Sequence, residues 1–149
     1  MEGKIFSINL SKSKGVSKLS VNEAKLVENF GFENDVHAGT DLRQVSLLSI
    51  ESIRKQKECK KVKKTGMVLK PGDFAENITT EGMDLSKLKI GYELKIGENI
   101  LLEVTKIGKE CQRYCSIYYK TGDCIMPREG IFVKVVKGGI VKKGDKIHL

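Results

Sequence analysis

The stretch G-Y-E-L-K-I-G-E-N-I-L-L-E-V-T-K-I-G, residues 91–108, decides the fold class of this sequence. It contains two strand-like runs, residues 92–96 and 100–107, on either side of a turn-forming Gly-Glu-Asn triplet. Short apolar runs bounded by glycine and asparagine are typical of neighbouring β-strands joined by tight turns. This stretch therefore predicts a β-rich domain.

Similar runs extend the pattern in both directions. Residues 131–136 and 146–149 are strand-like, and residues 4–10 place Phe6, Ile8 and Leu10 on one side of an opening strand. Turn signals recur from Pro71 to the end of the chain, and the sequence has 15 glycines. We expect a mainly β fold, an antiparallel closed β-barrel-like structure with one or two short helices.

One helix is expected after the apolar run 43–48. Ser49 is a suitable N-cap, and Ile50 and Ile53 share a helical face. The polar stretch 11–20 is predicted to be a solvated loop without a function. No fixed repeat or Pro/Ser-rich linker divides the 149 residues, so we expect a single domain over 1–149.

Composition limits the classes of partner. The formal net charge of +8 favours anionic partners, such as nucleic acid, a membrane surface or a phosphorylated small molecule. An aromatic content of 6% without tryptophan argues against base stacking, so a nucleic-acid partner is disfavoured. The chain has no apolar run of about 18 residues and no signal-peptide layout, which predicts a cytoplasmic protein without a membrane partner.

Cys124 is the first candidate for chemistry. It lies in G-D-C-I-M-P-R-E-G-I-F, residues 122–132, in a turn that precedes a strand. Thiolate is the reactive form of cysteine, and Arg128 would stabilise it if the turn folds back. The alternative is a buried apolar Cys124 with Arg128 paired to Glu129 at the surface. The local sequence leaves both alternatives open.

The other cysteines suggest a weaker alternative. Cys111 and Cys115 would share a face of a helix and, with Cys59 and Cys124, could supply four thiolates to zinc. Neither pair has the C-x-x-C spacing of a zinc knuckle, and Cys59 lies in a lysine-rich stretch. We therefore expect no structural zinc and a buried structural thiol at Cys115.

Two polar pairs are further candidates. Asp35 and His37 in D-V-H-A-G could bind a ligand or orient a base, although a loop held together by their own hydrogen bonds explains them as well. Glu76 and Asn77 in P-G-D-F-A-E-N-I-T-T-E-G would need partners if buried. Arg43 or Arg128 would be a natural partner for this pair.

The order of these pieces resembles the MOSC domain family, the C-terminal domain of molybdenum-cofactor sulfurases, in its stand-alone form. The resemblance runs from about residue 3 to the C-terminus, and seven pieces match in order: D-V-H-A-G, R-Q-V-S-L-L, P-G-D-F-A-E-N-I-T-T-E-G, I-G-Y-E-L-K-I-G, G-K-E-C, G-D-C-I-M-P-R-E-G-I-F and G-G-I-V-K-K-G-D. Asn34 stands where the family's loop usually has glycine, and asparagine tolerates the left-handed conformation. Gln112 follows Cys111 where relatives often have histidine, which weakens an acid/base role there.

The resemblance implies a cleft that holds molybdenum cofactor (molybdopterin) at a reactive cysteine, which by position is Cys124, with Cys111 as a second cysteine. Arg43, Arg113 and Arg128 would bind the anionic cofactor, together with Asp35, His37, Glu76 and Asn77. Cys124 would carry a persulfide or ligate molybdenum as its candidate metal ligand.

The chain has no pyridoxal-phosphate desulfurase domain, so the resemblance implies a separate sulfur donor. The expected partners are a cysteine desulfurase or a molybdenum-cofactor biosynthesis protein, with a molybdoenzyme as recipient. We therefore expect a molybdenum-cofactor-binding or sulfur-carrier domain, acting as a sulfur transferase if it is an enzyme. The alternatives are a molybdenum-dependent reductase of N-hydroxylated compounds and a non-enzymatic partner-docking module.

Overall fold

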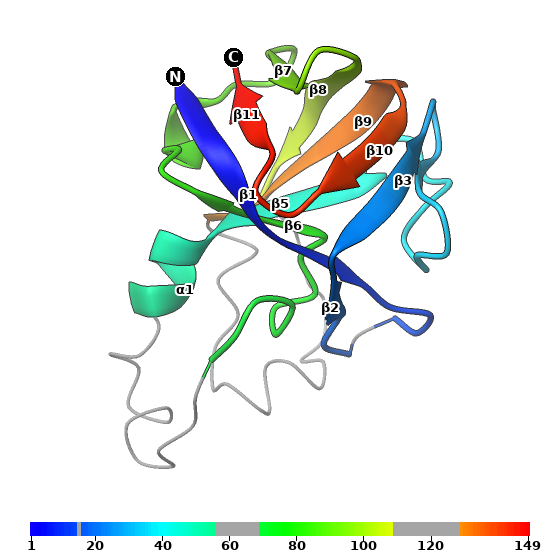
Figure 1. Ribbon diagram of the computed structural model, residues 1–149, viewed down its shortest axis with the longest axis vertical. Coiled ribbons are helices and arrows are strands. Elements are labelled where there is room, and N and C mark those ends of the chain that lie inside the picture. The colour runs from blue at the N-terminus through cyan, green and yellow to red at the C-terminus, as the bar shows by residue number, and fades with distance from the viewer. Residues whose placement is uncertain (15, 56–68, 109–128) are drawn as a thin grey trace.

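Seven strands close into a barrel in the computed structural model, which describes residues 1–14, 16–55, 69–108 and 129–149. The strand order is β11-β7-β8-β9-β5-β6-β1, and β1 pairs again with β11, so the ring closes where the two chain ends lie side by side (Figure 1). A three-stranded sheet, β10-β3-β4, lies beside the barrel, and β2 pairs with β1. The predicted closed β-barrel is confirmed.

The described elements follow one another along the chain with these bounds: β1 Glu2–Leu10, β2 Leu19–Val21, β3 Glu23–Val27, β4 Gly31–Phe32, β5 Val45–Ser49, α1 Ile50–Lys55, β6 Ile78–Glu81, a 3-10 turn η2 Leu85–Lys87, β7 Glu93–Ile96, β8 Ile100–Ile107, β9 Ile131–Lys137, β10 Gly139–Lys142 and β11 Lys146–His148.

One pair of barrel strands departs from the expected antiparallel arrangement. β5 and β6 run parallel, with Leu47 opposite Ile78. Parallel neighbours require a crossover connection, and here the chain between them includes α1. The barrel is therefore mixed in strand direction, which the turn signals alone did not reveal.

Aliphatic side chains fill the barrel. They alternate along each strand with residues that face outward, as in other small barrels whose interior is a packed core. The fully buried members include Ile5, Ile8, Val45, Leu47, Ile78, Leu94, Leu102, Val104, Val133, Val135 and Ile147.

The opening strand was predicted at residues 4–10 and spans Glu2–Leu10, but Phe6 was assigned to the wrong face. The register of β1 against β6 shifts between Ile5 and Ser7, which is the mark of a β-bulge. Ile8 therefore packs inside the barrel, whereas Phe6 packs against a second apolar cluster outside it. Strict alternation cannot anticipate a bulge.

This second cluster covers the outer flank of β5. It joins Leu48 and Phe132 of the barrel to Ile50 and Ile53 of α1 and to Phe74 of the 69–77 segment. The predicted helix and its cap are confirmed, because the backbone N–H of Ser52 donates to Oγ of Ser49 at 3.1 Å.

Segment 69–77 and β2 lie at the same end of the barrel, below β1 and β6 in the view of Figure 1. There the outward-facing residues Asn9, Ser46 and Thr79 are buried although they are polar. We call this region the polar flank. No helix among the described residues is long and apolar enough to cross a membrane.

Candidate functional site

Lys18, Asp35 and His37 form a buried polar cluster next to the barrel. Nζ of Lys18 lies 2.7 Å from Oδ1 of Asp35 and 2.9 Å from Nδ1 of His37. The side chains of Lys18 and Asp35 are fully buried, whereas 27% of the His37 side chain is exposed. Of these three side chains, His37 is therefore the one that reaches the surface.

Lys18 keeps the Asp35 carboxyl ionised. Burial by itself raises the pKa of Asp35, but the Lys18 ammonium and the Ser11 N–H outweigh burial and hold the pKa below its usual value. The buried pair is thus an ammonium next to a carboxylate. Such a pair is tolerated in the interior because each charge compensates the other.

The loop that carries Asp35 and His37 has the conformation expected from its sequence. Asn34 has φ of 68°, so asparagine does adopt the left-handed conformation where glycine is usual. The N–H of His37 donates to Oδ2 of Asp35 at 3.2 Å, and the N–H of Val36 donates to the Ser11 carbonyl at 2.8 Å. These hydrogen bonds hold the loop against the end of β1.

Lys18 is the residue that sequence reasoning missed. The stretch 11–20 was predicted to be a solvated loop without a role, and for Lys18 this prediction is wrong. Lys12 and Lys14 in the same stretch are exposed, and nothing in the local sequence distinguishes Lys18 from them. The Lys18 side chain contacts Asp35 and His37, and the Lys18 backbone meets a segment more than fifty residues away in the chain.

That segment meets Lys18 at Gly72. The Lys18 N–H donates to the Gly72 carbonyl at 2.7 Å, and Gly72 has φ of +91°. A Cβ at Gly72 would collide with the Lys18 carbonyl oxygen, so this close approach of two backbones requires glycine. The two predicted motifs, D-V-H-A-G and P-G-D-F-A-E-N, are therefore joined through Lys18.

The buried Glu76 side chain stabilises the conformation of segment 69–77. Its carboxylate accepts hydrogen bonds from the N–H of Gly72 at 3.0 Å, the N–H of Phe74 at 3.3 Å and the hydroxyl of Thr79 at 2.8 Å. Complete burial raises the pKa of Glu76 to about 7, and these donors only partly counter the effect. The pKa of this buried carboxyl therefore lies near neutral pH.

Asn77 connects the segment to the barrel strands. Its Oδ1 accepts from the Ser46 N–H at 3.0 Å, and its Nδ2 donates to the Asn9 carbonyl at 3.3 Å. Asn9 in turn donates to the Glu76 carbonyl at 3.1 Å. These bonds explain why the flank is polar although it is buried, since buried amides need partners.

The expected pairing of Arg43 with Glu76 is wrong. The side-chain partners of Glu76 among the described residues are N–H groups and a hydroxyl. The Arg43 guanidinium instead lies over the Phe132 ring, 5.8 Å from its centre, and Arg43 is partly exposed. A guanidinium that stacks on an aromatic ring can still donate its N–H groups to an acceptor lying in the guanidinium plane.

Cys124, Cys111, Arg113 and Arg128 lie outside the described residues, as do Cys59 and Cys115. The described residues that flank segment 109–128 are joined, because the Gly108 N–H donates to the Gly130 carbonyl at 2.8 Å. Ile107 also pairs with Ile131 across β8 and β9. The segment with the candidate cysteine thus begins and ends at one point of the barrel rim.

A hollow of about 520 Å³ opens at this rim. Residues from α1, from the turn after β6 and from the start of β9 line it, including Ser52, Asp84 and Glu129. Glu129 accepts a hydrogen bond from the Ser52 hydroxyl at 3.1 Å. Within residues 1–14, 16–55, 69–108 and 129–149, no three His, Cys, Asp or Glu side chains are grouped to hold a metal ion.

Together these features define a class of protein: a small closed β-barrel of mixed strand direction with a buried polar flank at one end. The MOSC domain model matches residues 34–148, and the chain belongs to the MOSC domain family. This family is associated with the molybdenum cofactor. No curated protein is significantly similar to the chain in sequence.

Solved structures share the fold at low sequence identity. The YuaD protein from Bacillus subtilis is 20% identical, with a TM-score of 0.76 over 99% of this chain and 94% of that one. YiiM from Geobacillus stearothermophilus is 18% identical, with a TM-score of 0.72 over 97% and 73% of the two chains. YiiM from Escherichia coli, also 18% identical, gives 0.73 over 100% and 69%.

Proposed function

We propose that this chain binds the molybdenum cofactor and either carries sulfur on Cys124 or ligates molybdenum through its thiolate. One observation carries the proposal. In a member of the MOSC family, the two motifs with the candidate cofactor residues, D-V-H-A-G and P-G-D-F-A-E-N, are brought together through Lys18. A buried polar network whose members are hydrogen-bonded holds them in one arrangement, and this rigidity supports a preformed site at the two loops.

The described residues fit an anionic cofactor. Arg43 and His37 reach the surface, and both can donate to phosphate oxygens. Asp35, Glu76 and Asn77 already accept or donate hydrogen bonds inside the protein, so we assign them the role of holding the two loops in position. The net charge of +8 favours approach of the anionic ligand.

Cys124 supplies the soft ligand in this proposal. It precedes Glu129 by five positions, and Glu129 lies at the rim hollow. A thiolate accepts sulfur by attacking the outer sulfur of a donor persulfide, whose S–S bond breaks as the donor leaves as a thiolate. The donor would be a cysteine desulfurase or a molybdenum-cofactor biosynthesis protein, and a molybdoenzyme would be the recipient.

When bound, the cofactor supplies the molybdenum centre and its dithiolene sulfurs. The chain's own contribution is binding and orientation: Arg43 and His37 donate hydrogen bonds, while Lys18 and Glu76 keep the loops in place. Arg113 and Arg128 are proposed as further donors on the segment that carries Cys124.

The test is an anaerobic titration of purified protein with molybdenum cofactor, following bound pterin fluorescence and bound molybdenum together. We expect tight binding by the wild type and weaker retention of molybdenum by Cys124→Ala. Cys59→Ala is the matched control, because it removes a thiol that the proposal does not use. Equal binding by the wild type and Cys124→Ala would show that Cys124 does not contact the cofactor. Absence of binding by either protein would reject the proposal.

The same preparations separate a carrier from a reductase. A carrier accepts radioactive sulfur from a desulfurase on Cys124, whereas a reductase turns over an N-hydroxylated compound when the cofactor is bound.

A further inference from the structure

The contact between segment 69–77 and the Lys18 backbone depends on one buried carboxyl. The Lys18 N–H donates to the Gly72 carbonyl at 2.7 Å, and the Gly72 N–H donates to Oε2 of Glu76 at 3.0 Å. A single glycine thus connects the Lys18 backbone to the Glu76 side chain. A change in the hydrogen bonds of Glu76 therefore acts on the contact that joins the two candidate loops.

The hydrogen-bonding partners of this carboxyl in the described part of the chain are uncharged. Glu76 is completely buried, and its carboxyl accepts from the N–H groups of Gly72 and Phe74 and from the Thr79 hydroxyl. Neutral donors compensate only part of the cost of burying an ionised carboxyl. The closed segment therefore favours the neutral form of Glu76.

Charged groups around segment 69–77 have contacts of their own. They comprise three residues of the neighbouring loops, Lys18, Asp35 and His37, and two residues of the segment, Lys70 and Asp73. The strands packed against the segment contribute uncharged side chains at this place, namely Asn9, Ser46 and Thr79. Desolvation is accordingly the largest influence on the pKa of Glu76, ahead of its hydrogen bonds.

Opening of the segment would expose Glu76 to water. In water its pKa returns from about 7 to the ordinary value of 4.5, so between these values the open form releases a proton that the closed form keeps. The equilibrium constant for opening therefore rises with pH in this interval, by up to about tenfold per pH unit, and becomes level above about pH 7.

We propose that Glu76 is a proton-dependent switch for segment 69–77: its neutral form keeps the segment closed on Lys18, and its ionisation promotes a local opening that releases the Lys18 backbone while the barrel stays folded. The opening is a property of the chain and requires no ligand. Its consequence for the site rests on the proposed function, because an open segment no longer joins the two loops that carry the candidate cofactor residues.

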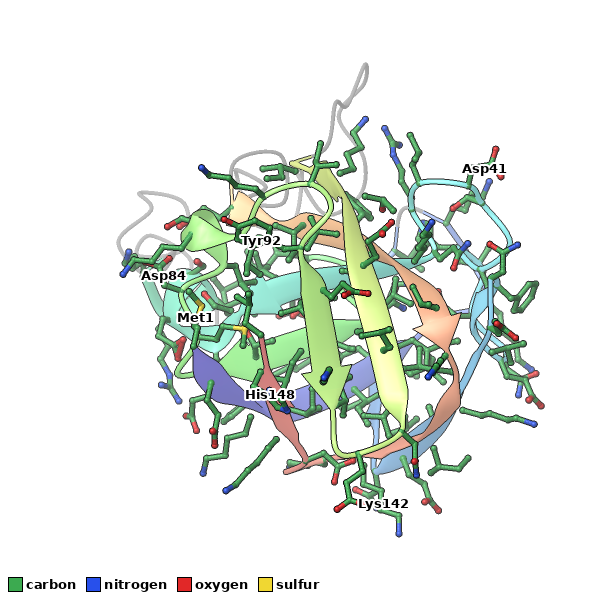
Figure 2. All side chains as sticks on the ribbon, turned by 90° about the horizontal axis from the view of Figure 1, so that it is seen from above. Met1, Asp41, Asp84, Tyr92, Lys142 and His148 are labelled. Carbon is green, nitrogen blue, oxygen red and sulfur yellow. The ribbon has the colours of Figure 1, made fainter. Side chains whose placement is uncertain are left out.

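The test is amide hydrogen exchange of the ¹⁵N-labelled full chain between pH 5 and pH 8, expressed as protection factors so that the intrinsic pH dependence of exchange is removed. The Lys18 and Phe74 amides report on the segment, because their hydrogen bonds are made to Gly72 and Glu76. The barrel reference is the Val104 amide of β8, which donates to the carbonyl of Tyr92, labelled in Figure 2, at 2.8 Å.

We expect the Lys18 and Phe74 amides to be less protected than the Val104 amide. Their protection should fall about 40-fold between pH 5 and pH 7 and change little above that, as two pKa values of 4.5 and about 7 require. Glu76→Gln cannot ionise and should remove this pH dependence, whereas the exposed Glu98→Gln should keep it.

Three results overturn the proposal. Equal protection of the Lys18, Phe74 and Val104 amides would mean that the segment opens only when the barrel unfolds. Protection that does not change with pH in the wild type would refute the proton dependence, also where Glu76→Gln does not fold. A pH dependence that persists in Glu76→Gln would assign the proton to another group.

The exchange experiment and the cofactor titration fail separately. Absence of cofactor binding rejects the proposed function and leaves the switch to the exchange data, which contain no ligand.

Discussion

Replacing Glu76 with glutamine tests the buried carboxyl on which the 71–77 segment depends. Burial raises the pKa of Glu76 from 4.5 to about 7 in the folded protein, so the folded state binds the proton more tightly than the unfolded state. Between these two values, the unfolded chain releases the proton and the folded chain keeps it. The contribution of Glu76 to stability is therefore fully present below pH 4.5 and declines as the pH rises to about 7.

The size of this decline follows from the shift. A change from 4.5 to about 7 corresponds to about 3 kcal/mol, since each pKa unit is worth roughly 1.4 kcal/mol. Glutamine cannot ionise, so the difference in the free energy of unfolding between the wild type and Glu76→Gln should change by this amount over the interval. Other titrating groups are common to both proteins and cancel in the difference.

The assay is urea unfolding of both proteins at intervals from pH 4 to pH 8. The wild type should lose stability relative to Glu76→Gln as the pH rises, and the difference should become level above about pH 7. Glu98→Gln, an exposed position in the β7–β8 turn, is the matched control for the loss of one carboxylate. A difference that stays constant with pH, or that changes in the opposite direction, would refute the reasoning.

Three further changes test the packing of the polar flank and the core. Lys18→Met should lower the free energy of unfolding by about 3–5 kcal/mol, because it leaves the Asp35 carboxylate buried without a counter-ion. Adding Asp35→Asn to it should recover part of this loss in the same urea experiment, and no recovery would contradict the pairing. Thr80→Val should increase the free energy of unfolding by about 1–2 kcal/mol and so raise the melting temperature, since the Thr80 hydroxyl is buried without a hydrogen-bond partner among the described residues. A lower melting temperature would show that the hydroxyl has a partner. Gly72→Ala should cost more stability than Gly91→Ala, because both glycines have positive φ but only Gly72 would collide with a backbone oxygen. Equal costs would mean that the collision is relieved.

Strand positions and turns were largely predictable because they depend on local chemistry. The runs around residues 92–107 and 131–136 are strands β7, β8 and β9 almost as expected. Turn residues and alternating apolar side chains act over a few neighbours, so the sequence displays them directly.

The site was predictable in its motifs but not in its contacts. The loops with Asp35, His37, Glu76 and Asn77 were recognised, whereas their common partner Lys18 was not. Of the two predicted partners of Glu76, Arg128 lies outside the described residues, and Arg43 lies over the Phe132 ring while backbone N–H groups donate to the Glu76 carboxylate. Contacts between residues separated by dozens of positions leave no local signal.

The β-rich fold and the MOSC resemblance could be predicted from the sequence, because turns, strand runs and motif order are encoded locally. Only the tertiary structure decided which polar side chains are buried together. Closure of the barrel, the bulge in β1 and the parallel pairing of β5 with β6 bring Lys18 against Gly72 and Asp35. Burial, not residue type, then makes Lys18 an internal counter-ion while Lys12 and Lys14 remain in solvent.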